Sequence, residues 1–451
     1  MKTIVFDDDP TGSQTVCNCP LLLNWEKSNL EKAISSNSLV FILANTRSLT
    51  AELAGNRITQ ICQSLKLVLT RNSISLDDIF IVSRGDSTLR GHAFLEPEII
   101  NQELGPFDAT FHIPAFFEGG RKTINSIHYL DDIPMHKTIF AKDSTFGYST
   151  SFLPDWIAEK SKGLINPDEI ISITIDQLNK ARESDSGMIN FIEELSRLRF
   201  NQKVIVDAES SIDLDTLCNA IKLLKGKKRF LFRSAASLIN SLTNIRTNHN
   251  HIKDYSSLII KYKDKKPKPG LILIGSYIPL ANNQLETLLK TDYFMEVELP
   301  VKKIFGILNN KNSEDSLFIL EDKLINKILD IIELKKTPIL YTSRGELTFK
   351  SDSSRMKFAI SLAESMARIT SHLFDRIGYI ISKGGITTNT LLTNGLKIEY
   401  VILKGQIMPG LSLVCPPQTF QYPPIPIITF PGNLGDKSTL FKAWKIMQSF
   451  S

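Results

Sequence analysis

Short apolar runs recur along the first half of the chain, and each one ends in a cluster of polar residues. The run T-I-V-F (3–6) leads into D-D-D-P-T-G, and I-F-I-V (79–82) leads into S-R-G-D-S-T-L-R-G. The other runs of this kind are L-V-F-I-L-A (39–44), A-T-F-H-I (109–113), K-V-I-V (203–206) and R-F-L-F (229–232). Apolar runs of this length predict buried strands, with the polar clusters at their carboxyl ends.

Stretches with helical spacing separate these runs. In the clearest, from Thr50 to Leu69, apolar residues recur at helical spacing, and Thr50 is the expected N-cap. Strands that alternate with helices predict an α/β fold with a mostly parallel sheet flanked by helices. Because ligands bind beyond the carboxyl ends of such strands, we expect several of the polar clusters to share one crevice.

The second half repeats this alternation, but its strands end in glycine, serine, threonine and lysine. The runs are L-I-L-I-G-S-Y (271–277), P-I-L-Y-T-S-R-G (338–345), G-Y-I-I-S-K-G-G-I-T-T (378–388), Y-V-I-L-K-G-Q-I-M-P-G (400–410) and I-P-I-I-T-F-P-G-N-L-G (425–435). Short glycine-rich turns expose backbone N–H groups that can bind phosphates. None of them has the Walker A or G-x-G-x-x-G spacing, so a nucleotide site here is of another type.

At 451 residues the chain exceeds what one hydrophobic core usually supports. We predict two α/β domains, residues 1–245 and 270–451, with the active site in the cleft between them. The predicted linker, 246–269, is first His/Asn-rich and then Lys/Pro-rich.

Composition narrows the function classes. The chain is 42% hydrophobic and 22% charged, with a net charge of +5, which suits small anionic ligands and indicates no nucleic-acid face. No apolar stretch has the length of a membrane span, and no signal peptide precedes the first strand, so we expect a cytoplasmic protein without a membrane partner. A homodimer is left open.

Three consecutive aspartates, Asp7 to Asp9, follow the first strand. Adjacent carboxylates repel and are costly to bury unpaired, which favours a ligand-binding turn. The alternative is a capping turn in which Asp9 or Thr11 accepts from free backbone N–H groups.

Four arginines lie near strand ends in the same half, namely Arg47, Arg84, Arg90 and Arg121. Guanidinium groups bind carboxylates at two points, and together with Asp8, Asp9 and Asp86 they suit a polyhydroxy acid. The alternative for Asp86 and Arg90 is a local ion pair at a helix start. We expect Asp86 to stay ionised and to orient or deprotonate an attacking hydroxyl.

An acid-and-arginine domain joined to a phosphate-binding domain predicts phosphoryl transfer, which needs a nucleotide and Mg²⁺. The sequence resembles the four-carbon acid sugar kinases, which use ATP to phosphorylate threonate, erythronate or oxo-tetronates. The matching motifs of the first half are D-D-P-T-G-S (8–13), N-T-R-S (45–48), D-S-T-L-R-G-H (86–92), P-A-F-F-E-G-G-R (114–121) and D-A-E-S (207–210). Those of the second half are G-S-Y (275–277), Q-L (284–285), S-K-G-G-I-T-T (382–388), P-G (409–410) and P-G-N-L-G (431–435).

The resemblance implies an N-terminal sugar-acid domain and a C-terminal nucleotide domain. It places Asp8, Arg47, Asp86 and Arg90 at the sugar acid. It places at ATP the residues Ser276, Gly384, Gly385, Ile386, Thr387 and Gly432. Two segments depart from the family pattern: Ile386 stands where many relatives have glutamate, and F-R-S-A-A-S (232–237) replaces G-S-A-G. The metal ligands are therefore not assigned.

Two other functions remain open at this point. I-V-F-D-D-D-P-T also fits a haloacid-dehalogenase-like phosphatase, with Asp7 as nucleophile and Asp9 as acid/base. A non-catalytic sugar-acid sensor would need the arginines but no phosphate-binding turns. We expect His92, His112 and His128 to be packed and hydrogen-bonded rather than part of the site.

Overall fold

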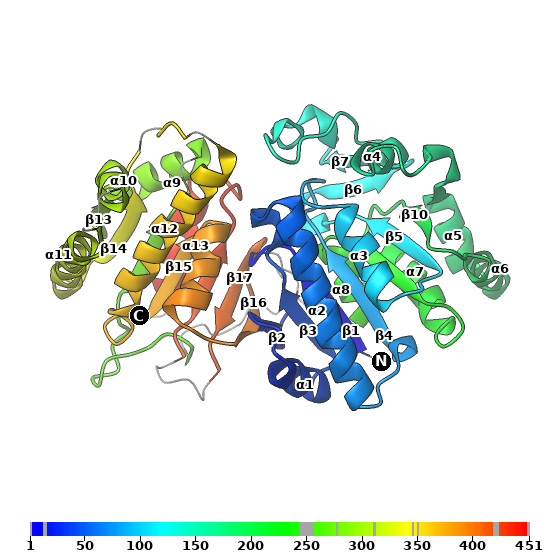
Figure 1. Cartoon of the computed structure of the whole chain (residues 1–451), viewed down its shortest axis with the longest axis horizontal. Helices are drawn as coiled ribbons and strands as arrows, with labels where there is room; N and C mark the ends of the chain where they lie inside the picture. Colours follow the sequence, from blue (N-terminus) through cyan, green and yellow to red (C-terminus); the bar gives the residue numbers. More distant parts are fainter. Residues whose placement is uncertain are drawn as a thin grey trace. The chain divides into compact units, whose positions relative to one another are not determined.

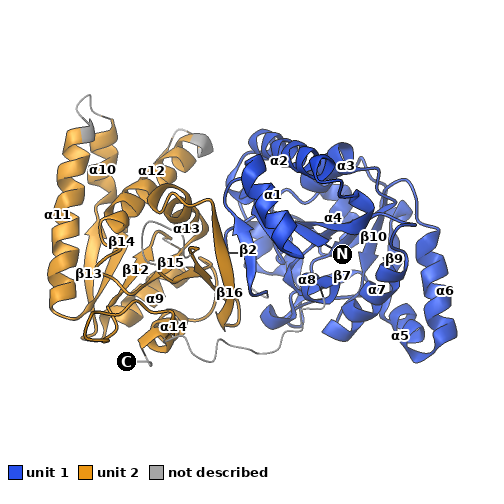
Figure 2. Ribbon diagram, turned by 90° about the horizontal axis from the view of Figure 1, so that it is seen from below, with its two compact units in different colours: residues 1–249 blue, residues 250–451 orange. Residues whose placement is uncertain are grey.

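The computed structural model describes residues 2–11, 16–243, 257–276, 278–309, 313–344, 347–349, 351–417 and 424–448. The chain forms two compact units, Met1–His249 and Asn250–Ser451, coloured separately in Figure 2. This division falls inside the predicted linker, of which residues 246–256 lie outside the described part of the chain. We describe each unit by itself.

Unit 1 is built on a parallel sheet of strand order β2-β3-β1-β4-β11-β5-β10-β9. Its strands are β1 (Lys2–Asp7), β2 (Cys19–Leu22), β3 (Leu39–Leu43), β4 (Ile79–Arg84), β5 (Ala109–Ile113), β9 (Ile171–Ile173), β10 (Gln202–Val206) and β11 (Phe230–Ser234). All six apolar runs of the first half are strands of this sheet, so this part of the prediction is confirmed. β2 and β9 were not predicted.

Helices connect and flank these strands (Figure 1). They are α1 (Lys27–Ser36), α2 (Ala51–Arg71), α3 (Leu95–Leu104), α4 (Leu153–Lys160), α5 (Ile175–Glu183), α6 (Asp185–Ser196), α7 (Ser211–Leu223) and α8 (Ala236–Thr243). Thr50 caps α2 as expected, because its side chain accepts from the backbone N–H of Leu53 at 3.4 Å. A small antiparallel sheet of β6 (Arg121–Ile124), β7 (Ile127–Leu130) and β8 (Ile133–Pro134) was not expected.

The register of the sheet brings four strand ends to one edge. Asp7 of β1 lies beside Leu43 of β3 and Arg84 of β4, and Arg84 lies beside Ser234 of β11. The polar segments that follow these strands therefore start at the same level of the sheet, as expected for parallel strands.

Unit 2 has a mixed sheet of order β13-β14-β12-β15-β18-β17-β16. Its strands are β12 (Gly270–Ile274), β13 (Phe294–Leu299), β14 (Thr337–Thr342), β15 (Tyr379–Lys383), β16 (Tyr400–Met408), β17 (Leu411–Cys415) and β18 (Ile427–Phe430). The neighbours from β13 to β18 are parallel, whereas β17 runs antiparallel to β18 and to β16. A mostly parallel sheet in each unit is thus confirmed.

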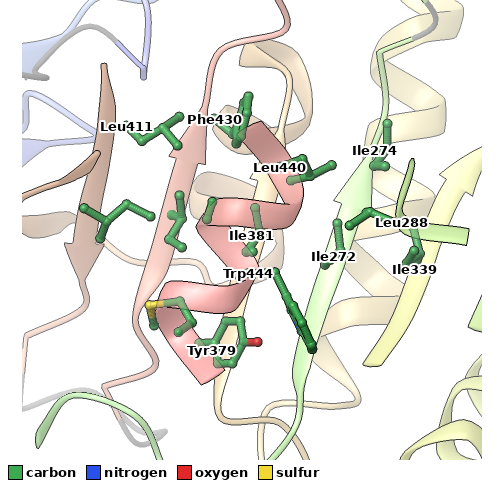
Figure 3. Close-up of a cluster of buried hydrophobic side chains, with 14 of the residues drawn as sticks. Ile272, Ile274, Leu288, Ile339, Tyr379, Ile381, Leu411, Phe430, Leu440 and Trp444 are labelled. Carbon is green, nitrogen blue, oxygen red and sulfur yellow. The ribbon is translucent and has the colours of Figure 1, made fainter. Parts of the chain in front are cut away.

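The helices of unit 2 are α9 (Pro279–Leu289), α10 (Val301–Leu308), α11 (Ser313–Glu333), α12 (Asp352–Ser371), α13 (Gly385–Thr390) and α14 (Thr439–Gln448). Side chains of α9 and α14 pack on one face of the sheet in the cluster of Figure 3, where Trp444 lies among aliphatic residues of β12 and β14. The indole N–H of Trp444 donates to Thr337 at 3.0 Å. Among the helices of the described residues, none combines the length and the apolar character that crossing a membrane requires.

Candidate functional site

Asp8 and Arg47 form a two-point ion pair in unit 1. Asp8 follows β1 and is fully buried, and its two carboxylate oxygens accept from Nη2 and Nε of Arg47 at 2.6 and 3.1 Å. Arg84, at the end of β4, lies 3.5 Å from Asp8 and 3.4 Å from Asp7. Burial raises the pKa of Asp8, and it raises the pKa of Asp7 to about 7, although the arginines act in the opposite direction.

Asp86 belongs to a second ion pair, in the loop after β4. Its carboxylate accepts from Nε of Arg90 at 2.8 Å and from the backbone N–H of Thr88 at 3.2 Å. Burial alone would raise the pKa of Asp86, but Arg90 and Arg47 outweigh burial and hold this pKa well below its usual value. The expectation that Asp86 is ionised therefore agrees with its surroundings. The pair is local, yet it lies in a loop, since α3 begins only at Leu95.

The two ion pairs are neighbours. A Cβ placed on Gly91, in the same loop as Asp86, would lie 3.2 Å from Oδ2 of Asp8, and Gly91 has a φ of +97°. Both the space and the backbone conformation therefore favour glycine here. Arg90 also reaches out of the loop, with Nη1 at 3.4 Å from Asp143. The structure thus brings together Asp8, Arg47, Asp86 and Arg90.

Asp9 has a different setting. It accepts from the backbone N–H of Thr11 at 2.8 Å and from the hydroxyl of the same residue. Its other oxygen lies 3.5 Å from Nη1 of Arg47. Asp9 therefore closes a local turn through Thr11, but the first element described after it is β2 rather than a helix to cap, and Gly12 and Ser13 of the same motif lie outside the described residues.

Arg233, in the departing segment F-R-S-A-A-S, belongs to a buried ion pair that sequence analysis missed. Arg233 of β11 donates to Glu96 of α3 at 2.7 Å and to the hydroxyl of Ser83 at 2.8 Å. Glu96 also accepts from Thr46 at 2.7 Å, next to Arg47. This pair ties together β4, β11 and α3 beneath the predicted sugar-acid residues. No short-range pattern indicates it, because its two members are 137 positions apart.

In unit 2, one cavity collects the whole set of residues predicted to bind ATP. It has a volume of about 650 Å³ and is lined, among others, by Ser276, Gly384, Gly385, Ile386, Thr387 and Gly432. These residues come from the ends of β12, β15 and β18, which are neighbours or near neighbours in the sheet. Tyr277, in the same motif as Ser276, lies outside the described residues.

The turn between β15 and α13 depends on glycine at Gly384. Its φ is +118°, a conformation that residues with a Cβ rarely adopt. Its backbone N–H donates to Phe430 at the end of β18, at 2.9 Å. The turn and the end of β18 are therefore held side by side, and both line the cavity.

Arg344 also lines the cavity and was not among the predicted site residues. Its Nη1 donates to the backbone oxygen of Ser276 at 2.9 Å, whereas Nε and Nη2 are buried without a partner among the described residues. Burial lowers the pKa of Arg344, but a guanidinium keeps its charge. The side chain therefore brings a positive charge to the wall of the cavity, with two of its donors buried and unpaired. The sequence signal was the arginine in T-S-R-G, directly after a buried strand.

Lys383 lies beneath the same turn and is completely buried. Its Nζ donates to the backbone oxygens of Pro431 and Gly432 at 3.2 and 3.0 Å and lies 4.1 Å from the ring centre of Phe430. Burial lowers the pKa of Lys383 to about 7. Its position ties the end of β15 to the glycine turn after β18.

Comparisons with known proteins agree with these two units. A family model described as a sugar-binding N-terminal domain matches residues 3–242, and one described as a nucleotide-binding C-terminal domain matches residues 271–440. A search of curated proteins finds no significant match.

Two solved structures share the fold over nearly the full length of both chains. A Salmonella typhimurium LT2 protein described as a presumed tRNA synthase is 15% identical with a TM-score of 0.66, covering 98% of each chain. A Haemophilus influenzae protein of the DUF1537 family is also 15% identical, with a TM-score of 0.60 and 99% coverage of each chain. At this identity the likeness concerns the fold, and the family models carry the assignment. The chain belongs to the four-carbon acid sugar kinase family, also called the DUF1537 family.

Proposed function

We propose that the chain is an ATP-dependent kinase that phosphorylates a hydroxyl of a four-carbon acid sugar, namely threonate, erythronate or an oxo-tetronate. The observation that carries the proposal is the cavity of unit 2, where the six predicted ATP residues and Arg344 line one space. The sugar-binding match to the other unit supports an acid sugar as the acceptor.

In this proposal the phosphates of ATP lie against the glycine turn and Arg344. Backbone N–H groups of Gly385 to Thr387, in the first turn of α13, would bind the phosphate oxygens, and the guanidinium of Arg344 would add a positive charge beside them. The apolar lining offers the purine base a surface for stacking and packing, through Phe349, Phe358, Leu362 and Met366.

Mg²⁺ would arrive with the nucleotide as MgATP. Among the described residues that line the cavity there is no carboxylate, and the described part of the chain holds no cluster of metal-ligating side chains. Mg²⁺ often takes most of its ligands from phosphates and water, which fits a substrate complex better than a resident ion. We assign no step to a protein-bound metal.

Unit 1 would bind the acceptor. Arg47 and Arg90 would face its carboxylate, Asp8 and Asp9 its hydroxyls, and Asp86 the hydroxyl that is phosphorylated. Since its pKa is lowered, Asp86 is a weak base, which favours orientation of the hydroxyl through a hydrogen bond over early removal of its proton. Transfer requires the two substrates to meet, so the cleft between the domains stays a prediction.

The test is release of ADP from MgATP in the presence of single acids. Purified chain is incubated with threonate, erythronate and their 2- and 3-oxo forms, with a no-acid control. We expect ADP release to depend on at least one acid. Absence of acid-dependent ADP from folded protein across the panel would overturn the proposal.

The same assay separates the alternatives. A sugar-acid sensor would bind an acid without forming ADP. A phosphatase would release inorganic phosphate from phosphorylated acids without a nucleotide. The structure disfavours the phosphatase, because its nucleophile Asp7 is fully buried and lies against Arg84.

A further inference from the structure

A small second cavity lies at the carboxyl ends of β4, β5 and β11, next to Asp86. Its volume is about 20 Å³, close to what a single water-sized group needs. Among its lining residues are His112, Trp156 and Ser234, together with Asp86, Arg90 and Arg233. We call it the His112 cavity.

Three of these side chains have polar atoms without a partner. The indole Nε1 of Trp156, the hydroxyl of Ser234 and both ring nitrogens of His112 are buried and unbonded within the described residues. The exposed fractions are 4% for His112, 4% for Trp156 and 3% for Ser234. Buried polar groups are nearly always hydrogen-bonded, so several unpaired groups around one cavity indicate a missing polar partner.

The expectation that the three histidines are packed and hydrogen-bonded is therefore wrong for His112. His128, on β7 of the small antiparallel sheet, is paired at both nitrogens, to the backbone oxygen of Ser87 at 2.8 Å and to the hydroxyl of Thr123 at 3.0 Å. His92 is bonded to the backbone oxygen of Leu49 at 3.0 Å. His112 is also buried, but it has no such partner among the described residues.

The free groups of the cavity are uncharged. Burial lowers the pKa of His112 well below its usual value, with Lys203 and Arg233 acting in the same direction, so the ring is neutral near pH 7. The two cations in the lining are already paired, Arg90 with Asp86 and Arg233 with Glu96. What remains is an indole N–H donor, a hydroxyl and a neutral imidazole, each able to bond a neutral oxygen.

We propose that the His112 cavity is a subsite for one uncharged oxygen of the acid sugar, a hydroxyl or a carbonyl, held beside Asp86. This rests on the proposed function. The carboxylate of the substrate lies elsewhere, at Arg47 and the outer part of Arg90. A hydroxyl fits the lining, because it can accept from Trp156 and donate to His112 or Ser234.

The size of the cavity limits what it can hold. A space of this size takes one oxygen-bearing group, so it fits a single hydroxyl or carbonyl of the acid. The competing explanation is a structural water that fills the cavity and never meets the substrate.

The experiment compares binding in the full-length chain by calorimetry. The ligands are threonate or erythronate, whichever releases more ADP with the unaltered protein, and its three monodeoxy analogues. The variants are Trp156→Phe, which removes the N–H donor together with part of the ring, and Ser234→Ala, which removes only the hydroxyl. Trp25→Phe is the matched control, since Trp25 stacks under Arg57 outside this cavity.

We expect Trp156→Phe and Ser234→Ala to weaken binding of the acid several-fold, up to about ten-fold. One of the three deoxy analogues lacks the hydroxyl that the cavity binds. The variants should bind this analogue as tightly as the unaltered chain does, and it should be the same analogue for both variants. Trp25→Phe should bind all four ligands normally.

A structural water gives a different pattern. The variants would then bind the acid normally, or would lose the same affinity for the acid and for all three analogues. Either result overturns the subsite. ADP formation by the unaltered chain would still uphold the proposed function. An unaltered chain that neither binds an acid nor forms ADP overturns both. Two variants are used so that poor folding of one, checked by circular dichroism, leaves the other to decide.

Discussion

Two buried carboxylates of unit 1 differ in their pKa directions and therefore in what they can do. The pKa of Asp86 is lowered by its two arginine neighbours, whereas burial raises that of Asp8 in spite of Arg47. An ionised acceptor suits the hydroxyl that reacts. The carboxylate of Asp8 is bonded to Arg47 at both oxygens and is therefore held in one position, which suits a residue that binds the substrate.

We predict that Asp86→Asn lowers kcat much more than it changes the affinity for either substrate, because the hydrogen bond to the reacting hydroxyl matters most in the transition state. Asp8→Asn should weaken binding of the acid. Steady-state kinetics with both substrates varied, together with thermal unfolding, measures these effects. If Asp86→Asn keeps near-normal turnover and Asp8→Asn abolishes it, the two roles are to be exchanged.

The second prediction concerns Arg344 at the nucleotide cavity. Arg344→Ala removes a positive charge from the wall of the cavity, and a charged hydrogen bond to a phosphate is worth about 1.5 to 3 kcal/mol. Affinity for MgATP should fall by ten-fold or more, with binding of the acid unchanged. Arg376→Ala is the control, because Arg376 is an exposed arginine of the same unit. Equal nucleotide affinity of both variants would place Arg344 outside the phosphate site.

Lys383 gives a prediction about pH. Its pKa is about 7 in the folded chain against 10.5 in the unfolded chain, so the folded chain binds fewer protons between these values. The free energy of unfolding therefore gains a term that rises with pH across this window, by up to about 1.4 kcal/mol per pH unit. Chemical unfolding between pH 7 and 10 should show a smaller rise in the free energy of unfolding for Lys383→Met than for the unaltered chain. Parallel curves would mean that Lys383 is charged in the folded chain.

At the scale of elements, the turn between β15 and α13 is the most sensitive part of the cavity. Of the two adjacent glycines predicted to contact ATP, Gly384 is the one with a positive φ. Gly384→Ala should disturb the turn through backbone strain and weaken MgATP binding, while binding of the acid persists. Gly306→Ala is the control, since Gly306 lies within α10 with open space around its Cα. Normal nucleotide affinity in Gly384→Ala would make the turn structural only.

Strands buried on both faces were predictable, because a short, continuous apolar run such as that of β4 is stable only where both of its faces are buried. β13 was missed for the opposite reason: its buried residues alternate with the exposed Glu296 and Glu298, as expected at a sheet edge. The short strands β6 to β8 carry too few apolar residues for any periodicity to appear.

The same contrast holds for the candidate site. The predicted residues were those whose type is unusual at a strand end, such as Asp86 or the glycines of the turn. Arg233 and His112 were missed or set aside, because their roles depend on partners that are present or absent only in the folded chain. Sequence spacing cannot show whether a histidine has found a hydrogen bond.

At the scale of the whole molecule, each unit has its own buried core and its own candidate site. We predict two unfolding transitions in differential scanning calorimetry, since units with separate cores need not unfold together. MgATP should raise the midpoint of one transition and the acid that of the other, each by about 2.7 kcal/mol of stabilisation at a hundred times Kd. A single transition that responds to both ligands would show that the units unfold as one.

The lining of the unit 2 cavity also bears on how strictly the phosphate donor is chosen. Purine bases are told apart at their edges, by directional donors and acceptors. Phe349, Phe358, Leu362 and Met366 would offer stacking and dispersion, which guanine satisfies as well as adenine, so the choice of base would fall to polar lining residues such as Asn282 and Ser343. In the proposed binding mode the glycine turn and Arg344 would respond instead to the charge of the triphosphate tail. Those contacts would be the same for every nucleoside triphosphate, so only the few polar side chains around the base could favour ATP over GTP.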